Sequence, residues 1–242
     1  MISIWGPDLN YTPDYWPFWL KIGAVLVLLV IVGILGHALL RVMFSKKTTA
    51  GEMHKTYMYI LPVRLWHWLN ALFFIALLVT GILNHFTIGP TASMVKIHHL
   101  LGKMYLGVWA LFIIMGVATG NMKHYVMTLS GIVGRIWKQA MYYLYGILKG
   151  EPHPFAVTAE NKFNPIQQVS YIGVMFALVP LILASGLLAL YAKSAWALVI
   201  HFGLAIVGLM FIFIHVYMCT TGDKPSYLVK GMIDGYHRED SH

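Results

Sequence analysis

The sequence is poor in cysteine and in charge, and both shortages restrict what the chain can be. A single cysteine, Cys219, excludes an internal disulfide, a four-cysteine zinc site and an iron–sulfur cluster. No C-x-x-C-H motif is present, so covalent c-type haem attachment is not expected. Only 11% of the residues are charged, whereas a soluble domain carries about a quarter. The chain is therefore not an ordinary soluble domain.

Apolar residues dominate instead, at 59% of the chain and a mean hydropathy of +0.70. They gather in runs of about twenty residues, the length that a helix needs to cross a bilayer core. These runs cover residues 22–40, 65–83, 98–118, 169–191 and 195–219. Residues 134–148 mix basic and aromatic side chains, which indicates a helix lying in the membrane interface. The pattern predicts an all-α transmembrane helix bundle.

The formal net charge of +8 is located between the apolar runs, so it indicates membrane topology rather than a nucleic-acid site. If the N-terminus is periplasmic, the inner segments carry most of the basic residues, as the positive-inside rule requires. The outer ends then keep only Lys21, Lys96, Lys103 and Lys193. We therefore expect a multi-pass protein of the bacterial inner membrane, with its C-terminus in the cytoplasm.

Two histidines in the last apolar run, His201 and His215, carry the strongest functional signal. They are fourteen residues apart, which returns the side chain to within about 40° of the same helix face. At about 1.5 Å per residue the two rings lie about 21 Å apart along the axis. One helix would thus present an imidazole near each membrane surface, as two metal centres stacked across a bilayer would require.

The predicted topology gives a partner to each of these histidines. His67 lies at the cytoplasmic depth of His215, and His98 lies at the periplasmic depth of His201. Four histidines on three helices can supply both axial ligands to two b-type haems. We therefore predict the iron ligands His67, His98, His201 and His215.

Glycines mark where a porphyrin could press on a helix. Gly81 follows His67 by fourteen residues, at the depth of the outer haem, and Gly102 lies one turn after His98. Glycine permits such close approach because it has no side chain. His99 competes with His98 as the ligand, and the position of Gly102 favours His98.

A haem-free transporter or proton channel with histidines in its path is the alternative from another functional class. Against it, the apolar runs contain few carboxylates and no paired chain of acids and bases. Arg64 lies one turn before His67 and could pair with a haem propionate, as arginine suits carboxylate geometry. It could equally be a plain topology charge.

Three segments carry a resemblance to a known family. Residues 62–83, PVRLWHWLNALFFIALLVTGIL, resemble the first haem-bearing helix of the b-type cytochrome subunits of nickel–iron hydrogenases and respiratory formate dehydrogenases. Residues 98–102, HHLLG, resemble the second ligand motif of that family. Residues 162–167, KFNPIQ, are most similar to the thiosulfate reductase cytochrome b branch.

This resemblance covers residues 57–220 and implies a four-helix di-haem cytochrome b domain. Residues 1–50 would add an extra transmembrane helix, and residues 221–242 would form a cytoplasmic tail. The implied function is to anchor periplasmic iron–sulfur and catalytic subunits, of molybdopterin or hydrogenase type, and to exchange electrons with menaquinone or ubiquinone. Substrate chemistry would then happen on other chains, without a catalytic residue here. The alternative is a stand-alone cytochrome b561 that acts as a quinol:oxygen oxidoreductase.

The resemblance also implies where quinone binds. In the formate dehydrogenase branch, the asparagine that Asn164 matches contacts quinone beside the cytoplasmic-side haem. Asn161 stands where that branch has a glutamine. The alternative for both residues is helix capping before the fourth apolar run.

Overall fold

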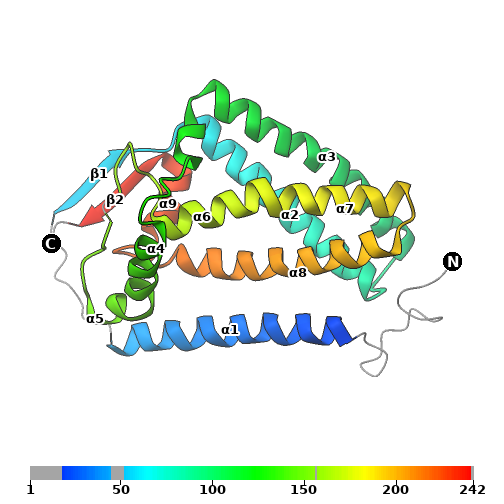
Figure 1. The fold of residues 1–242 in the computed structure, drawn as a ribbon, viewed down its shortest axis with the longest axis horizontal. Coiled ribbons are helices and arrows are strands. Elements are labelled where there is room, and N and C mark those ends of the chain that lie inside the picture. The colour runs from blue at the N-terminus through cyan, green and yellow to red at the C-terminus, as the bar shows by residue number, and fades with distance from the viewer. Residues whose placement is uncertain (1–17, 45–51, 156, 241–242) are drawn as a thin grey trace. The chain divides into compact units, whose positions relative to one another are not determined.

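The computed structural model describes residues 18–44, 52–155 and 157–240 (Figure 1). In this part of the chain, five helices are long and apolar enough to cross a membrane. They are α1 (Phe18–Phe44), α2 (Leu61–His85), α3 (Thr91–Ala118), α8 (Ala195–Met218) and a composite fourth span. The composite span joins α6 (Pro165–Gly173) to α7 (Val179–Tyr191) through a π-turn at Val174–Leu178. The predicted all-α transmembrane bundle is confirmed.

Four of the five spanning helices extend past the apolar runs that predicted them, while α8 ends at Met218, one residue before the end of its run. The largest difference is at α3, which begins at Thr91 and not near His98. Pro90 immediately precedes it, and its carbonyl accepts hydrogen bonds from the amides of Ser93 and Met94. Polar and small residues can continue a helix into the headgroup region once its core is long enough. The apolar run alone therefore marks the membrane-spanning part and underestimates the helix.

The predicted interfacial helix is present as α4 (Ile132–Met141), a π-turn (Tyr142–Gly146) and α5 (Ile147–Lys149). Gly131 and Gly150 flank it with φ values of 63° and 70°, a backbone region that glycine adopts without strain. One face leaves Val133 and Trp137 78% and 65% exposed, while Gln139 is fully buried. An exposed apolar face with aromatic and basic residues fits a membrane interface.

The fourth span begins with a capping box built on Asn164. Its side-chain oxygen accepts from the amide of Gln167 at 3.0 Å, and the Gln167 side chain accepts from the Asn164 amide at 3.1 Å. Pro165 follows at the first helical position, where its missing N–H costs nothing. The Asn164 side-chain amide also donates to the Tyr143 hydroxyl at 2.8 Å. The capping alternative for Asn164 is thus realised in the structure.

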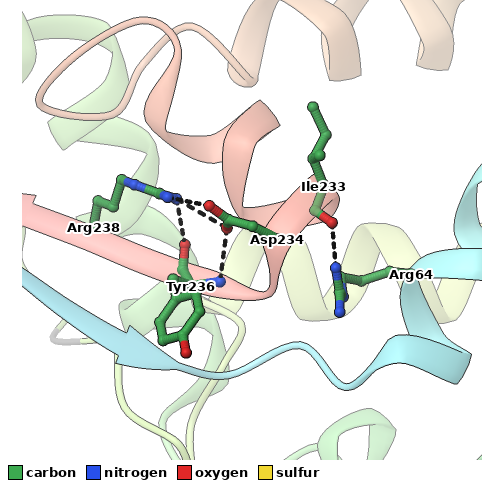
Figure 2. A network of polar contacts seen from close by, with 5 residues as sticks. All are labelled: Arg64, Ile233, Asp234, Tyr236 and Arg238. Atoms are coloured by element: carbon green, nitrogen blue, oxygen red, sulfur yellow. Dashed lines mark hydrogen bonds and ion pairs between the residues drawn. The ribbon is translucent and has the colours of Figure 1, made fainter.

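The segment after residue 221 folds further than the polar tail expected from the sequence. It contains α9 (Tyr227–Asp234) and β2 (Tyr236–Asp240), which pairs antiparallel with β1 (Met53–Tyr57). Figure 2 shows Arg238 paired with Asp234, and Arg64 donating to the carbonyl oxygen of Ile233. These contacts attach the C-terminal segment to the residues that precede and open α2.

The described residues divide into two compact units. Residues 18–30, 66–112 and 175–212 form the first, and residues 31–44, 52–65, 113–155, 157–174 and 213–240 form the second. Tyr105, fully buried in the first unit, donates to the side-chain oxygen of Asn70 at 2.8 Å. Trp66 and Trp109 donate from their indole nitrogens to backbone carbonyls of α3 and of the π-turn. The hydroxyl of Tyr105 and the indole N–H groups of Trp66 and Trp109 therefore all have hydrogen-bond partners within the first unit.

The capping box makes a prediction about stability. Replacing Asn164 by alanine removes the side-chain acceptor for the Gln167 amide and should lower the free energy of unfolding by about 1 kcal/mol. Thermal unfolding of the detergent-solubilised protein measures this. Asn164→Ser retains a capping oxygen and should unfold close to the wild-type temperature. Equal unfolding temperatures for the alanine variant and the wild type would contradict a stabilising cap.

Candidate functional site

Two of the predicted ligands, His98 of α3 and His201 of α8, lie together in the first unit. Their ring centroids are 6.2 Å apart and their planes are nearly perpendicular, at 88°. Two imidazole nitrogens that bind one metal from opposite sides at about 2 Å each bring the ring centroids to about 6 Å. The observed separation therefore suits two imidazoles that would together hold one haem iron.

Thr80 of α2 holds the ring of His98. Its hydroxyl oxygen lies 2.9 Å from His98 Nδ1 and also 2.7 Å from the carbonyl oxygen of Ala76. Since the carbonyl can only accept, the hydroxyl proton is directed to Ala76, and Nδ1–H of His98 donates to Thr80. A Cβ atom added at the neighbouring Gly81 would lie 3.4 Å from the ring. Glycine here lets helix backbone approach the imidazole.

Helix α7 holds the ring of His201 in the same way. His201 Nδ1 lies 2.9 Å from the carbonyl oxygen of Ile182 and 3.3 Å from the hydroxyl of Ser185. That hydroxyl again donates to its own helix, at 2.7 Å from the carbonyl oxygen of Leu181. A Cβ atom added at Gly186 would meet the His201 ring at 3.1 Å. Each imidazole is thus held by a hydroxyl residue followed by glycine.

These contacts assign the proton on both imidazoles. With Nδ1–H donating, each neutral ring keeps its lone pair on Nε2, the nitrogen that would bind a metal. Histidines that bind metals typically donate their other ring nitrogen to a carbonyl or a polar side chain in this manner. The Thr80-Gly81 and Ser185-Gly186 pairs were missed as a pattern by the sequence analysis, although the repeated dipeptide is visible in the sequence.

The predicted glycines have different surroundings. Gly81 was expected to leave room for a porphyrin, and the structure brings it against the ring of His98. A Cβ atom at Gly102 would meet nothing within 4 Å, so the space beside it is open. Of the two adjacent histidines, His98 is the one that lies beside His201.

The other predicted pair falls in different units, His67 in the first and His215 in the second, so their pairing stays a prediction. His67 packs edge-on against Trp68, with ring centroids 5.2 Å apart. The ring centroids of His215 and Tyr171 are 6.3 Å apart, and His215 Nε2 is 3.9 Å from the sulfur of Cys219. Both histidines are thus lined by aromatic or weakly polar neighbours.

The remaining predicted residues lie in the second unit. Arg64 donates to the carbonyl oxygen of Ile233 in α9. Asn161 lies in an exposed turn, where its amide donates to the Thr158 hydroxyl at 3.0 Å. Asn164 is 5% exposed and shares a hydrogen bond with Tyr143. Burial raises the pKa of Tyr143 to about 12, so its hydroxyl stays protonated at neutral pH.

Comparisons with known proteins agree with this architecture. The family model for prokaryotic cytochrome b561 matches residues 58–235. The chain is 44% identical to "Putative cytochrome YdhU" of Escherichia coli (strain K12), over 95% of this chain and 92% of that protein. It is 24% identical to "Probable Ni/Fe-hydrogenase B-type cytochrome subunit" of Rhizobium leguminosarum bv. viciae, over 76% and 89%. No solved structure matches the chain.

The family match covers more than half of the chain and leaves α1 outside it. The match to YdhU spans nearly the whole chain and so includes this extra helix. The five apolar helices agree with a multi-pass membrane protein. The chain belongs to the prokaryotic cytochrome b561 family, whose members are multi-pass membrane proteins that bind haem b and transfer electrons.

Proposed function

We propose that the chain is the membrane-anchoring di-haem cytochrome b subunit of a respiratory oxidoreductase. In this role it transfers electrons between the quinone pool and a periplasmic redox partner. The observation that carries the proposal is the pair His98 and His201, whose separation suits one iron and whose Nδ1 atoms are both engaged by the protein. His67 and His215 would be the ligands at the inner haem.

When bound, haem b supplies a one-electron iron couple whose potential depends on its axial ligands. Residues of this chain fix the orientation of the two imidazole rings. Thr80 accepts from Nδ1–H of His98, and the Ile182 carbonyl accepts from Nδ1–H of His201. Such hydrogen bonds make an imidazole a stronger electron donor and favour oxidised iron. Because both rings donate Nδ1–H to the protein, we expect a haem bound at this site to have a lowered midpoint potential.

The path of electrons across the membrane follows from the depths of the two histidine pairs. With the N-terminus in the periplasm, His98 and His201 lie near the outer surface, and His215 lies near the inner one. Electrons would then enter at one face and leave at the other. We propose that the periplasmic iron–sulfur and catalytic subunits dock at the outer face. The similarity to a protein named as a hydrogenase cytochrome subunit favours this over a stand-alone quinol:oxygen oxidoreductase.

Quinone would bind on the inner side, near the start of the fourth span, as menaquinone or ubiquinone. Both polar ends of the Asn164 side chain are engaged, by Gln167 and by Tyr143. Its amide therefore acts on quinone by orienting the protonated Tyr143 hydroxyl or by exchanging that partner for a quinone carbonyl. Asn161 is more exposed and would contact the ring from the surface side.

The ligand assignment predicts which histidines hold which haem. His98→Ala or His201→Ala should remove one of two haems per chain, because one imidazole cannot replace the missing axial ligand. His99→Ala should retain both. A pyridine haemochrome titration against protein concentration measures the count, and reduced-minus-oxidised spectra show which haem is lost. Loss of the outer haem in His99→Ala together with its retention in His98→Ala would reverse the assignment.

The hydroxyl that holds His98 predicts a change in redox potential. Thr80→Val removes the acceptor for Nδ1–H, so oxidised iron loses stabilisation and the midpoint potential of one haem should rise by about 40 mV, the equivalent of one hydrogen bond of about 1 kcal/mol. A potentiometric titration measures this. Thr80→Ser should restore the wild-type potential. A potential that does not move in Thr80→Val would remove this residue from the haem site.

The quinone proposal predicts a kinetic effect without a spectral one. Asn164→Ser keeps the helix cap but loses the amide that meets Tyr143. Oxidation of the reduced haems by a soluble menaquinone analogue should slow by about tenfold, the effect of one lost polar contact. Stopped-flow absorbance measures the rate, with Asn161→Ser as a second variant. An unchanged rate in both variants, with both haems intact, would place the quinone site elsewhere.

A further inference from the structure

A cationic cavity of about 260 Å³ lies in the second unit, between the end of α3 and the start of α6. Lys123, Arg135 and Lys162 line it, and Glu160 is the only carboxylate among its lining residues. Its wall is held in place by Gln168, which donates to the carbonyl oxygens of His124 and Val126 at 3.0 and 3.1 Å. The lining of the cavity thus carries three positively charged side chains and one negatively charged side chain.

Polar atoms in its lining lack partners in the described structure. His124 is only 6% exposed, and its Nδ1 is buried without a hydrogen bond. The Nε atom of Arg135 is also buried and unpaired, although the same guanidinium donates to the Thr128 carbonyl. A buried polar atom without a partner costs about 1–3 kcal/mol. A ligand oxygen in the cavity would remove this cost at the Nε–H of Arg135, and at Nδ1 of His124 when that ring is protonated.

The charges in the cavity are not balanced by the protein. Burial and the nearby charge of Lys123 lower the pKa of Lys162. Burial and the charges of Lys162 and Lys123 lower the pKa of His124. Both shifts have the sign expected where positive groups repel each other in a partly dry environment. A bound anion would offset the repulsion between these positive groups and so raise the pKa values of Lys162 and His124.

The surroundings place this cavity at the level of lipid headgroups. The membrane-crossing helices α3 and α6 end at Ala118 and begin at Pro165, within a few residues of Lys123 and Lys162. Beside the cavity the apolar side chains of Val126 and Leu129 are 74% and 71% exposed. Exposed apolar side chains next to a basic cluster indicate contact with the interface of a membrane, where anionic lipids present their phosphates.

We propose that this cavity binds a phosphate-bearing anion, and that the anion is the headgroup of an anionic phospholipid. Lysine and arginine side chains recognise phosphate oxygens through charge-assisted hydrogen bonds, and His124 adds a further polar contact. Inorganic phosphate has the same chemistry, but the depth of the cavity favours a lipid. The inference stands independently of the haem assignment, whereas Asn161, which the quinone proposal also uses, is one of the lining residues of the cavity.

Native mass spectrometry of the intact, haem-loaded protein in detergent tests the proposal. Phosphatidylglycerol is titrated in, with phosphatidylcholine of identical acyl chains and inorganic phosphate as separate probes. We expect phosphatidylglycerol to bind in preference to phosphatidylcholine. Lys123→Gln with Lys162→Gln should weaken phosphatidylglycerol binding by about fivefold for each lysine removed, given the strength of a single charge near anionic lipid.

Two control variants separate a specific site from general charge. Lys149→Gln with Lys230→Gln removes the same charge at exposed positions outside the cavity and should bind phosphatidylglycerol as the wild type does. Lys123→Arg with Lys162→Arg should also retain binding. Competition by inorganic phosphate at millimolar concentration would support the phosphate chemistry and identify free phosphate as the source. Equal binding of both lipids, or unchanged phosphatidylglycerol binding in Lys123→Gln with Lys162→Gln, would overturn the proposal.

Discussion

The structure depends on one constraint, that polar groups inside apolar helices must find their partners within the protein. No water is available in a bilayer core to satisfy them. Thr80 and Ser185 meet this constraint twice, since each hydroxyl donates to its own helix and accepts from an imidazole. Because those bonds use Nδ1 of His98 and His201, the same constraint decides which nitrogen of each ring remains for a metal.

At the ends of the spans the same constraint is met by capping and by loops. Asn164 closes the first turn of the fourth span, and Gln168 one turn later ties that span to the loop after α3. Asn164 directly precedes the helix, and Gln168 lies in its first turn. The contacts of Gln168 hold the loop that carries Lys123 and His124, so the helix start and the cationic cavity are parts of one arrangement.

Much of this architecture could be predicted from the sequence. Length and hydropathy located the five spans, and the mixture of Arg135 with Trp137 located the interfacial helix. The short sheet was not predictable, because β1 and β2 are mostly polar and lack the alternation of apolar and polar residues typical of strands. They form by pairing with each other, which joins segments far apart in the chain.

The sequence alone determined which residue types lie at which depth, because rise and rotation per residue are constant along a helix. It therefore located His201 and His215 on one face and brought His98 to the depth of His201. Only the tertiary structure decided that Gly81 packs against His98, that Thr80 and Ser185 hold the two rings, and that the Asn164 side chain reaches Tyr143. Contacts between helices depend on how side chains pack across them, and a pattern read along a single helix contains no information about the surface of its neighbour.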